Sequence, residues 1–214
     1  MSQEIVIVGS GAHARVVLDI LRASGKAESV KAFVDVETKG EVPDSIEGIQ
    51  VLKGLEAMQE FVKSHECAAI LGHGNNSRRK AVLPQVEAMG VTLTTAVHPS
   101  AIISPGVEIG GGTTVSAGTV IVTGAKIGKG VIVNTAATVD HDCVIEDFVQ
   151  LAPGAHLAGR VKVGAEAFIG IGAVVIQNLT IGAGSVIGAG AAVVRDVPPQ
   201  SLVIGVPARV RKHL

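Results

Sequence analysis

The sequence predicts a small N-terminal α/β domain of the Rossmann-like type, followed by a parallel β-helix. Over residues 1–96, short apolar runs alternate with Gly-rich turns and amphipathic segments, as they do in nucleotide-binding α/β folds. Over residues 97–196, an aliphatic residue recurs at every sixth position from Val97 to Val193 without a break. A short fixed period of this kind is typical of stacked repeats. Residues 197–214 are expected to form a C-terminal tail.

Composition excludes several function classes. The 214 residues carry 18 Lys and Arg against 19 Asp and Glu, so broad nucleic-acid binding is not indicated. Only Cys67 and Cys143 are present, which argues against a disulfide framework and is typical of a reducing cytoplasm. No apolar run reaches the ~18 residues needed to span a membrane, and the N-terminus lacks the features of a signal peptide. We therefore expect a cytoplasmic protein.

The first strand–turn–helix unit has the features of a phosphate-binding site. Residues 4–8 form an apolar run, and a turn of small residues, 9–14, follows it directly. Aliphatic residues then recur at helical spacing until Gly25, and a second strand ends in Asp35. Small residues let the backbone approach a phosphate, a helix N-terminus supplies N–H donors, and an acid at the second strand accepts from a sugar hydroxyl. The alternative interpretation is a tight turn that binds nothing.

A second unit of the same kind follows at residues 67–77, and Asn76 or Ser77 is expected to cap a helix that starts near Arg78. Two such turns at the carboxyl edge of one sheet form a crevice, which is where ligands bind in these folds. His13 lies within the first turn and is a candidate ligand contact, whereas His65 and His73 are expected to be surface or turn residues. About 96 residues leave no room for a full dinucleotide fold, so a mononucleotide or nucleotide sugar is favoured over NAD.

The six-residue register predicts which way each side chain of the repeats points. With the aliphatic position called i, position i+4 is small or β-branched almost throughout, and both are expected to point inward. Three flat faces close a triangular coil of about 18 residues, which gives between five and six coils. Flat outer faces of small residues favour packing of prisms around a three-fold axis, so a homotrimer is expected.

One repeat carries chemically active side chains. His141 and Asp142 lie at outward positions i+2 and i+3, and His156 is also expected to point outward. Cys143 lies at an inward i+4 position and is expected to be a core residue. Imidazole titrates near neutral pH and suits general acid–base catalysis. The alternatives are a solvated surface histidine, or a metal site with Asp140; three neighbouring residues do not readily converge on one ion, so no metal is expected.

Several segments together resemble a known enzyme family. They are the hexapeptide repeat, the run HDCVI at 141–145 and the closing GVPAR at 205–209. With them the chain resembles the hexapeptide-repeat acyltransferases, whose parallel β-helix is left-handed. The run VGSGAH at 8–13 resembles the branch that contains sialic-acid and bacterial sugar acetyltransferases, and the resemblance covers essentially the whole chain. Ala12 and Ala14 stand where this branch commonly has glycine.

The resemblance implies an N-acetyltransferase that uses acetyl-CoA as co-substrate. Members of this branch acetylate the 4-amino group of nucleotide-linked 4-amino-4,6-dideoxy sugars for bacterial surface glycans, and GDP-perosamine is the substrate expected first. The alternatives are a UDP-linked sugar of the bacillosamine type, transfer to a sugar hydroxyl, and a nucleotide-binding scaffold without catalysis.

The resemblance also implies the roles of individual residues. His141 is expected to be the general base and Asp142 to orient or tune it, while Asn134 is expected to hold the sugar at a subunit seam. Because the amine is itself a nucleophile, we expect direct attack on the thioester, with a backbone N–H such as that of Gly159 stabilising the oxyanion. The implied nucleotide-sugar site comprises Ser10, Gly11, Ala12, His13, Asp35, Gly74 and Asn75, and the implied CoA site comprises Gln150, Gly159, Ile171, Ala189 and Arg209.

Overall fold

The computed structural model describes residues 3–36 and 41–214. The chain divides into two compact units, Met1–Pro99 and Ser100–Leu214. The first contains all of the helices that the structure describes, and the second consists of short strands.

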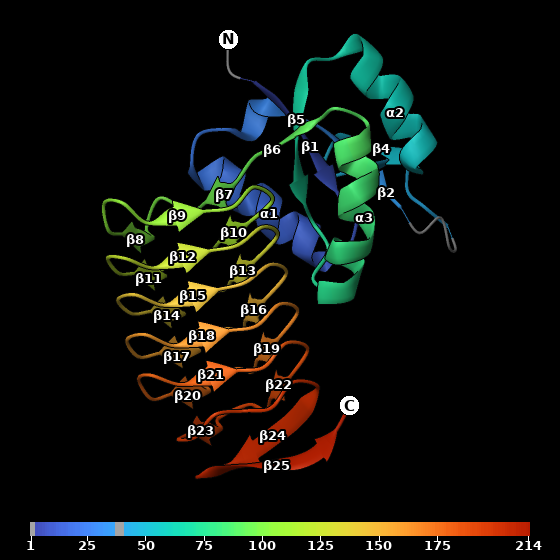
Figure 1. The fold of residues 1–214 in the computed structure, drawn as a ribbon. Coiled ribbons are helices and arrows are strands. Elements are labelled where there is room, and N and C mark those ends of the chain that lie inside the picture. The colour runs from blue at the N-terminus through green and yellow to red at the C-terminus, as the bar shows by residue number, and fades with distance from the viewer. Residues whose placement is uncertain (1–2, 37–40) are drawn as a thin grey trace. The chain divides into compact units, whose positions relative to one another are not determined.

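The first unit is a mainly parallel sheet with the strand order β3-β4-β2-β1-β5-β6 (Figure 1). Only β3 and β4 pair antiparallel; the other neighbours are parallel. This arrangement confirms the expected Rossmann-like α/β fold. The strands are β1 Glu4–Val8, β2 Val30–Asp35, β3 Ser45–Ile46, β4 Ile49–Lys53, β5 Cys67–Leu71, β6 Thr92–Leu93 and β7 Ala96–Val97, and the helices are α1 Ala12–Ala23, the 3-10 helix Ala27–Ser29, α2 Leu55–Ser64 and α3 Asn76–Ala88.

Close packing of α1 against the central strands fixes the first Gly-rich turn. Val17, Leu18 and Leu21 on one face of α1 are buried in a cluster with apolar residues of β1, β2 and β5. The turn after β5 packs against β1 and this helix, because a Cβ on Gly72 would lie 2.8 Å from Ile7 Cγ2 and 3.0 Å from Ala14 Cβ. In the first turn, a Cβ on Gly9 would lie 2.9 Å from the carbonyl carbon of Gly72. Glycine at this position therefore lets the two turns approach each other.

The carboxyl ends of β1, β2 and β5 meet at one edge of the sheet. Strand β1 lies between β2 and β5, so the chain runs first to one side of β1 and then crosses to the other. Ligands bind in α/β sheets at such a topological switch point.

The prediction that Asn76 or Ser77 caps α3 was wrong. Asn75 is the cap, because its side-chain oxygen accepts a 3.0 Å hydrogen bond from the Arg78 N–H, three residues on.

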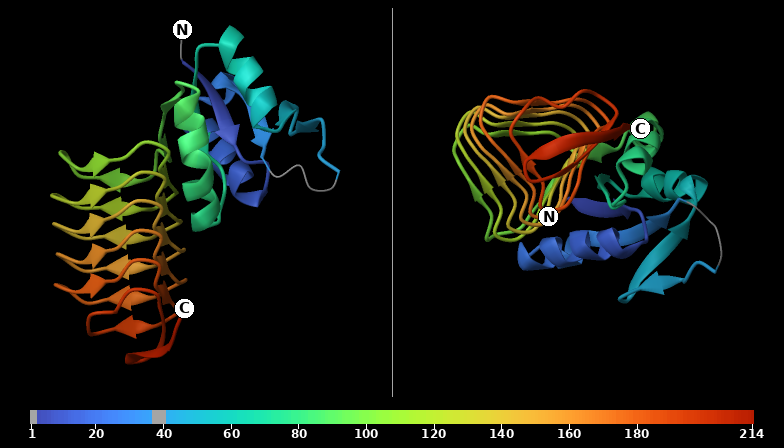
Figure 2. Two further views of the ribbon diagram at one scale, coloured as in Figure 1. Left: turned by 45° about the vertical axis from the view of Figure 1, so that its right-hand side comes forward. Right: turned by 90° about the horizontal axis from the view of Figure 1, so that it is seen from below.

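The second unit is a parallel β-helix built from three sheets, and its coils stack in Figure 1 and superpose as a triangle in the right-hand view of Figure 2. One sheet contains β8, β11, β14, β17, β20 and β23, the next contains β9, β12, β15, β18 and β21, and the third contains β10, β13, β16, β19, β22, β24 and β25. The strands are β8 Ile102–Ile103, β9 Glu108–Ile109, β10 Thr114–Val115, β11 Val120–Ile121, β12 Lys126–Ile127, β13 Ile132–Val133, β14 Thr138–Val139, β15 Val144–Ile145, β16 Gln150–Leu151, β17 His156–Leu157, β18 Lys162–Val163, β19 Phe168–Ile169, β20 Val174–Val175, β21 Thr180–Ile181, β22 Val186–Ile187, β23 Ala192–Val193, β24 Ser201–Gly205 and β25 Ala208–His213.

The predicted register is confirmed through the stack. Up to β23, strands 18 residues apart in the sequence pair in parallel, as Thr138 does with His156 and Leu157 with Val175. Every sixth aliphatic residue from Val115 to Val193 is buried. The coil is therefore 18 residues long, and its interior is filled by branched aliphatic side chains and small residues.

Each corner of the coil requires a backbone in the left-handed region. From Gly106 to Gly190, the residue at i+3 of each repeat has a positive φ, and most of these residues are glycine. Asp142, Arg160 and Asn178 are exceptions at successive coils of one corner, with φ of 58°, 60° and 63°. Residues with a side chain are disfavoured there by roughly 1–2 kcal/mol, although Asp and Asn tolerate it better than Arg.

The chain after the last regular coil forms a hairpin. Strand β24 pairs with β22 at an offset of 16 residues (Val186 with Leu202), two fewer than in the regular coils. Strand β25 then pairs antiparallel with β24. Residues 201–213, expected to lie in a tail, are thus strands of the second unit.

Truncation of a core side chain tests this packing. Ile181 is fully buried, so Ile181→Ala is expected to lower the free energy of unfolding by roughly 2–5 kcal/mol. The matched control Thr180→Ala, at the neighbouring outward position, is expected to change it by less than about 0.5 kcal/mol. Urea unfolding followed by circular dichroism measures both. Equal losses in the two variants would contradict the assigned inward and outward positions.

Candidate functional site

The two Gly-rich turns of the first unit enclose a crevice of about 440 Å³. Residues of the turn after β1, the end of β2 and the turn after β5 line it. The nucleotide-sugar residues implied by the family resemblance come together here, with the exception of Asn134, which belongs to the second unit. The lining residues are Ser10, Gly11, Ala12, His13, Asp35, Val36, Gly72, His73, Gly74, Asn75 and Arg78.

An acid and a hydroxyl lie side by side at the end of β2. The Ser10 hydroxyl donates a hydrogen bond to Asp35 Oδ2. This bond joins the turn after β1 to the strand that carries the carboxylate. The other lone pairs of Asp35 can accept from a sugar hydroxyl or a base N–H, as an acid at this position does in nucleotide-binding folds.

His13 is held as a neutral imidazole in the crevice. Its pKa is lowered to about 4, chiefly by burial and then by the positive charge of Arg79 and the nearby His73. Its Nε2 atom is buried and finds no hydrogen-bond partner among the residues that the structure describes. A buried polar atom without a partner is uncommon in folded proteins, which makes His13 Nε2 a candidate for a contact with a bound ligand or an ordered water.

The crevice is basic, and sequence reasoning missed the side chains that make it so. Arg78 lines it directly, and Arg79 is fully buried close to it. His73, expected to be an ordinary turn residue, also lines it. The first turns of α1 and α3 contain no acid. Two adjacent arginines at a helix N-terminus, where acidic residues are favoured, are the signal that would have indicated an anion site.

The second candidate site lies at the corner of the β-helix that follows β14. His141 Nδ1 and Asp142 Oδ2 are 2.9 Å apart, and the two side chains are 40% and 59% exposed. The His141 backbone N–H donates to Asp140 Oδ1 at 2.7 Å, which holds the corner. Both side chains point outward, as the register predicts. Because a carboxylate is only an acceptor, Asp142 favours the tautomer with hydrogen on Nδ1 and leaves Nε2 available to accept a proton.

Glycines in the neighbouring coils make room for this pair. Gly159 lies one coil after His141, and a Cβ there would overlap the imidazole, 2.6 Å from Cε1. Gly124 lies one coil before Asp142, and a Cβ there would overlap the carboxylate. Within the described part of the chain, no acceptor is found for the Gly159 N–H. His141 therefore packs beside an open backbone donor.

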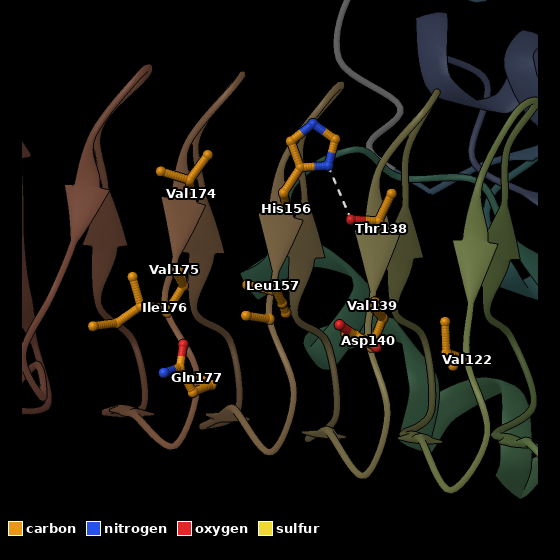
Figure 3. Close-up of a pocket in the computed structure, with 11 residues that line it drawn as sticks. Val122, Thr138, Val139, Asp140, His156, Leu157, Val174, Val175, Ile176 and Gln177 are labelled. Atoms are coloured by element: carbon orange, nitrogen blue, oxygen red, sulfur yellow. Dashed lines mark hydrogen bonds between the residues drawn. The ribbon is translucent and has the colours of Figure 1, made fainter.

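Beside this corner, a groove of about 460 Å³ runs over the outer face of β11, β14, β17 and β20. Figure 3 shows Val122, Val174 and Ile176 along it, with the polar side chains of Asp140 and Gln177 near the ends of their strands. His156 points outward as predicted, and its Nδ1 lies 2.9 Å from Thr138 Oγ1. The groove is mainly apolar, so it suits a flexible chain with few charges.

The residues implied for CoA binding lie at several separate places. Gly159 is at the His141 corner, whereas Ile171 and Ala189 lie at the corner that precedes the groove face, and Ile171 is 60% exposed. Gln150 lies on β16, and Arg209 is exposed on β25. The structure does not bring these residues together within one chain.

Asn134 and Cys143 lie apart from the His141 side chain. The Asn134 side chain accepts a 2.8 Å hydrogen bond from the Thr135 N–H at the corner after β13. Cys143 is fully buried as predicted, and burial raises the pKa of its thiol. Its Sγ donates to the Ala158 carbonyl oxygen at 3.2 Å. A buried, protonated thiol is unsuited to nucleophilic attack.

The described residues contain neither a cluster of metal-ligating side chains nor a membrane-spanning helix. No group of three or more His, Cys, Asp or Glu side chains that could hold a metal ion occurs in residues 3–36 and 41–214. Over the same ranges, none of the helices has the length and apolar character needed to cross a membrane.

Comparison with known proteins gives matches over nearly the whole chain. A family model for the PglD N-terminal domain matches residues 4–86. GDP-perosamine N-acetyltransferase of Escherichia coli O157:H7 is 34% identical over 177 residues, which cover 81% of this chain and 78% of that protein.

Solved structures are similar over a greater length. A histidine-to-asparagine mutant of perosamine N-acetyltransferase from Caulobacter crescentus, in complex with CoA and GDP-perosamine, superposes with a TM-score of 0.92. It is 38% identical and covers 99% of this chain and 98% of its own. The acetyltransferase domain of PglB from Neisseria gonorrhoeae FA1090, in complex with acetyl coenzyme A, has a TM-score of 0.90 and 35% identity and covers 98% of this chain and 100% of its own.

The pH dependence of stability tests the environment of His13. Its pKa is about 4 in the folded protein against an ordinary value of 6.5, so the unfolded chain binds more protons between these two pH values. The stability that neutral His13 confers is present above pH 6.5 and is lost as the pH falls toward 4, by up to roughly 3 kcal/mol. The measurement is urea unfolding of the wild type and His13→Gln from pH 8 to 4.5. As the pH falls, the free energy of unfolding should decrease less steeply for His13→Gln than for the wild type. Parallel curves for the two proteins would contradict the lowered pKa of His13.

Proposed function

Because the chain belongs to the family of hexapeptide-repeat nucleotide-sugar acetyltransferases with a left-handed β-helix, we propose that it transfers an acetyl group from acetyl-CoA to a sugar amine. The acceptor is the 4-amino group of a nucleotide-linked 4-amino-4,6-dideoxy sugar, with GDP-perosamine as the preferred substrate. The observation that carries the proposal is the pairing of His141 with Asp142 beside the open Gly159 N–H, in a chain similar to CoA-bound relatives over nearly its full length.

The crevice of the first unit binds the nucleotide part of the substrate in this proposal. The N–H groups at the start of α1 and α3, together with Arg78, stabilise the diphosphate. Asp35 accepts from a hydroxyl of the ribose or an N–H of the base, and His13 donates or accepts through its partnerless Nε2. Ser10, Gly11, Ala12, Gly74 and Asn75 complete the wall of the crevice.

Direct attack accounts for the chemistry at the His141 corner. The amine nitrogen bonds to the thioester carbonyl carbon and becomes positively charged, and His141 Nε2 accepts its proton. The Gly159 N–H stabilises the tetrahedral oxyanion. As the carbon–sulfur bond breaks, the CoA sulfur leaves as a thiolate and takes the proton from the imidazolium. Asp142 holds the imidazole and stabilises its charged form, and no step requires an acyl-enzyme.

A homotrimer is part of the same proposal. The outer face with the groove exposes apolar side chains that a second chain would cover, namely Ile102, Val174, Ile176 and Val194. The corner with Ile171 and Ala189 is separate from the His141 corner, so assembly of neighbouring chains would supply CoA contacts to one site from two subunits. Asn134, Gln150 and Arg209 are assigned to the sugar or CoA contacts of such a seam.

We also place the reaction in the cytoplasm. Both cysteines are free and buried, which is typical of proteins that fold in a reducing compartment.

A substrate panel tests the proposed function. Release of the CoA thiol from acetyl-CoA is followed with GDP- and UDP-linked 4-amino-4,6-dideoxy sugars and with their 4-hydroxy counterparts. The proposal expects the greatest kcat/KM with GDP-perosamine. Greater thiol release with the UDP-linked amine would show that the preferred nucleotide carries uracil and not guanine. Release only with 4-hydroxy sugars would indicate O-acetylation. If no sugar of the panel causes release of the CoA thiol, the proposed enzymatic activity is contradicted and a nucleotide-binding scaffold is favoured.

Replacement of His141 tests the assigned general base. His141→Ala is expected to lower kcat by roughly 10²–10⁴-fold, because the proton of the attacking amine loses its acceptor. The control Lys162→Ala changes an exposed side chain of the same β-helix and is expected to leave kcat unchanged. Steady-state kinetics at saturating nucleotide sugar measures both. Undiminished turnover by His141→Ala would show that another group removes the proton.

A further inference from the structure

The largest fully buried side chain in the part of the chain that the structure describes is a charged one, Arg79. It lies in the first turn of α3, and its guanidinium turns back toward the crevice. Nη1 donates to the carbonyl oxygens of His73 and Gly74, each at 3.1 Å, and Nη2 donates to Asn76 Oδ1 at 2.9 Å. Arg79 therefore holds the Gly-rich turn that follows β5.

This position is unfavourable for a cation. Burial lowers the pKa of Arg79 to about 10, because removal from water disfavours the charged form. The positive end of α3 disfavours it as well. An apolar side chain of similar volume commonly serves packing as well as or better than a buried charge. Stability of the fold therefore does not explain why a charged side chain is buried at this position.

The hydrogen bonds of Arg79 orient the backbone of the turn. In a planar trans peptide the C=O and the following N–H point in opposite directions. Arg79 binds the carbonyl oxygens of His73 and Gly74, so the N–H groups of Gly74 and Asn75 are directed away from the guanidinium. Neither N–H has an acceptor among the described residues, and both residues line the crevice. Successive backbone N–H groups of this kind form an anion-binding concavity.

We propose that Arg79 is a positioning residue for the diphosphate of the nucleotide sugar. It fixes the turn so that the N–H groups of Gly74 and Asn75 meet the diphosphate, and its buried charge adds to the positive potential there. This inference rests on the proposed nucleotide-binding function of the crevice. The effect of Arg79 on the pKa of His13 supports it, because the charge is felt at a crevice-lining side chain.

The test compares Arg79→Gln, Arg79→Lys and the control Lys80→Gln, which changes the exposed residue next in α3. Calorimetric titration uses whichever of GDP and UDP binds wild type more tightly, and then its parent nucleoside. Arg79→Gln is expected to weaken diphosphate binding by roughly 10–100-fold, since hydrogen bonds and charge are lost together, and nucleoside binding by less than about threefold. Arg79→Lys restores the charge and should recover part of the preference for diphosphate. Lys80→Gln should match wild type.

Kinetics provides a second readout. Arg79→Gln should raise KM for the nucleotide sugar by a similar factor, while kcat at saturation and KM for acetyl-CoA stay within about threefold of wild type. A purely structural role would instead weaken nucleoside and nucleoside diphosphate equally. That result, or unchanged diphosphate binding by Arg79→Gln, would overturn the inference.

Wild-type protein gives a measurement that does not depend on how the variants fold. Amide hydrogen exchange of Gly74 and Asn75 should slow by about tenfold or more when GDP or UDP saturates the crevice. Unchanged exchange at both amides would contradict the proposal. Diphosphate binding without any CoA release in the substrate panel would refute the proposed enzyme but not the role of Arg79 in binding.

Discussion

The stacking of each residue on the residue 18 positions away is the constraint on which the corner with His141 and Asp142 depends. Through most of the stack, the backbone N–H of a corner residue with positive φ donates a hydrogen bond to a backbone carbonyl oxygen of the coil before. Arg160 donates in this way to the carbonyl oxygen of His141, at 2.8 Å. A side chain at a corner therefore has room only where the residue stacked on it in the adjoining coil is small. His141 fits over Gly159, and Asp142 fits over Gly124. The reactive pair exists because two adjoining coils lack side chains where it needs room.

The two units position their candidate site residues in different ways. In the first unit, the crevice is formed by backbone turns whose geometry depends on packing behind them, through Gly72 against Ile7 and through Arg79 against two carbonyl oxygens. In the second unit, the position of His141 follows directly from the register.

Much of the fold and part of the site follow from local patterns. The six-residue period determined the coil length, the burial of Cys143 and the outward direction of His141, because strand alternation allows few other solutions. The small-residue turns and Asp35 likewise indicated the crevice. Arg79 was not predicted, since sequence gives no sign that a charged residue of a helix will be wholly buried. The Asn75 cap was missed by one residue, a usual error at a helix start.

The 18-residue coil also limits how a chain of this kind can change its length. Loss or gain of a single residue within a coil would shift every later side chain by one position in the six-residue register, so that interior Val and Ile would leave their inward positions. A whole coil can be gained or lost without this effect, because the strands above and below it have the same pairing. The height of the prism therefore changes most readily in whole coils. Gly124 and Gly159 are then the positions at which one substitution would most directly close the site.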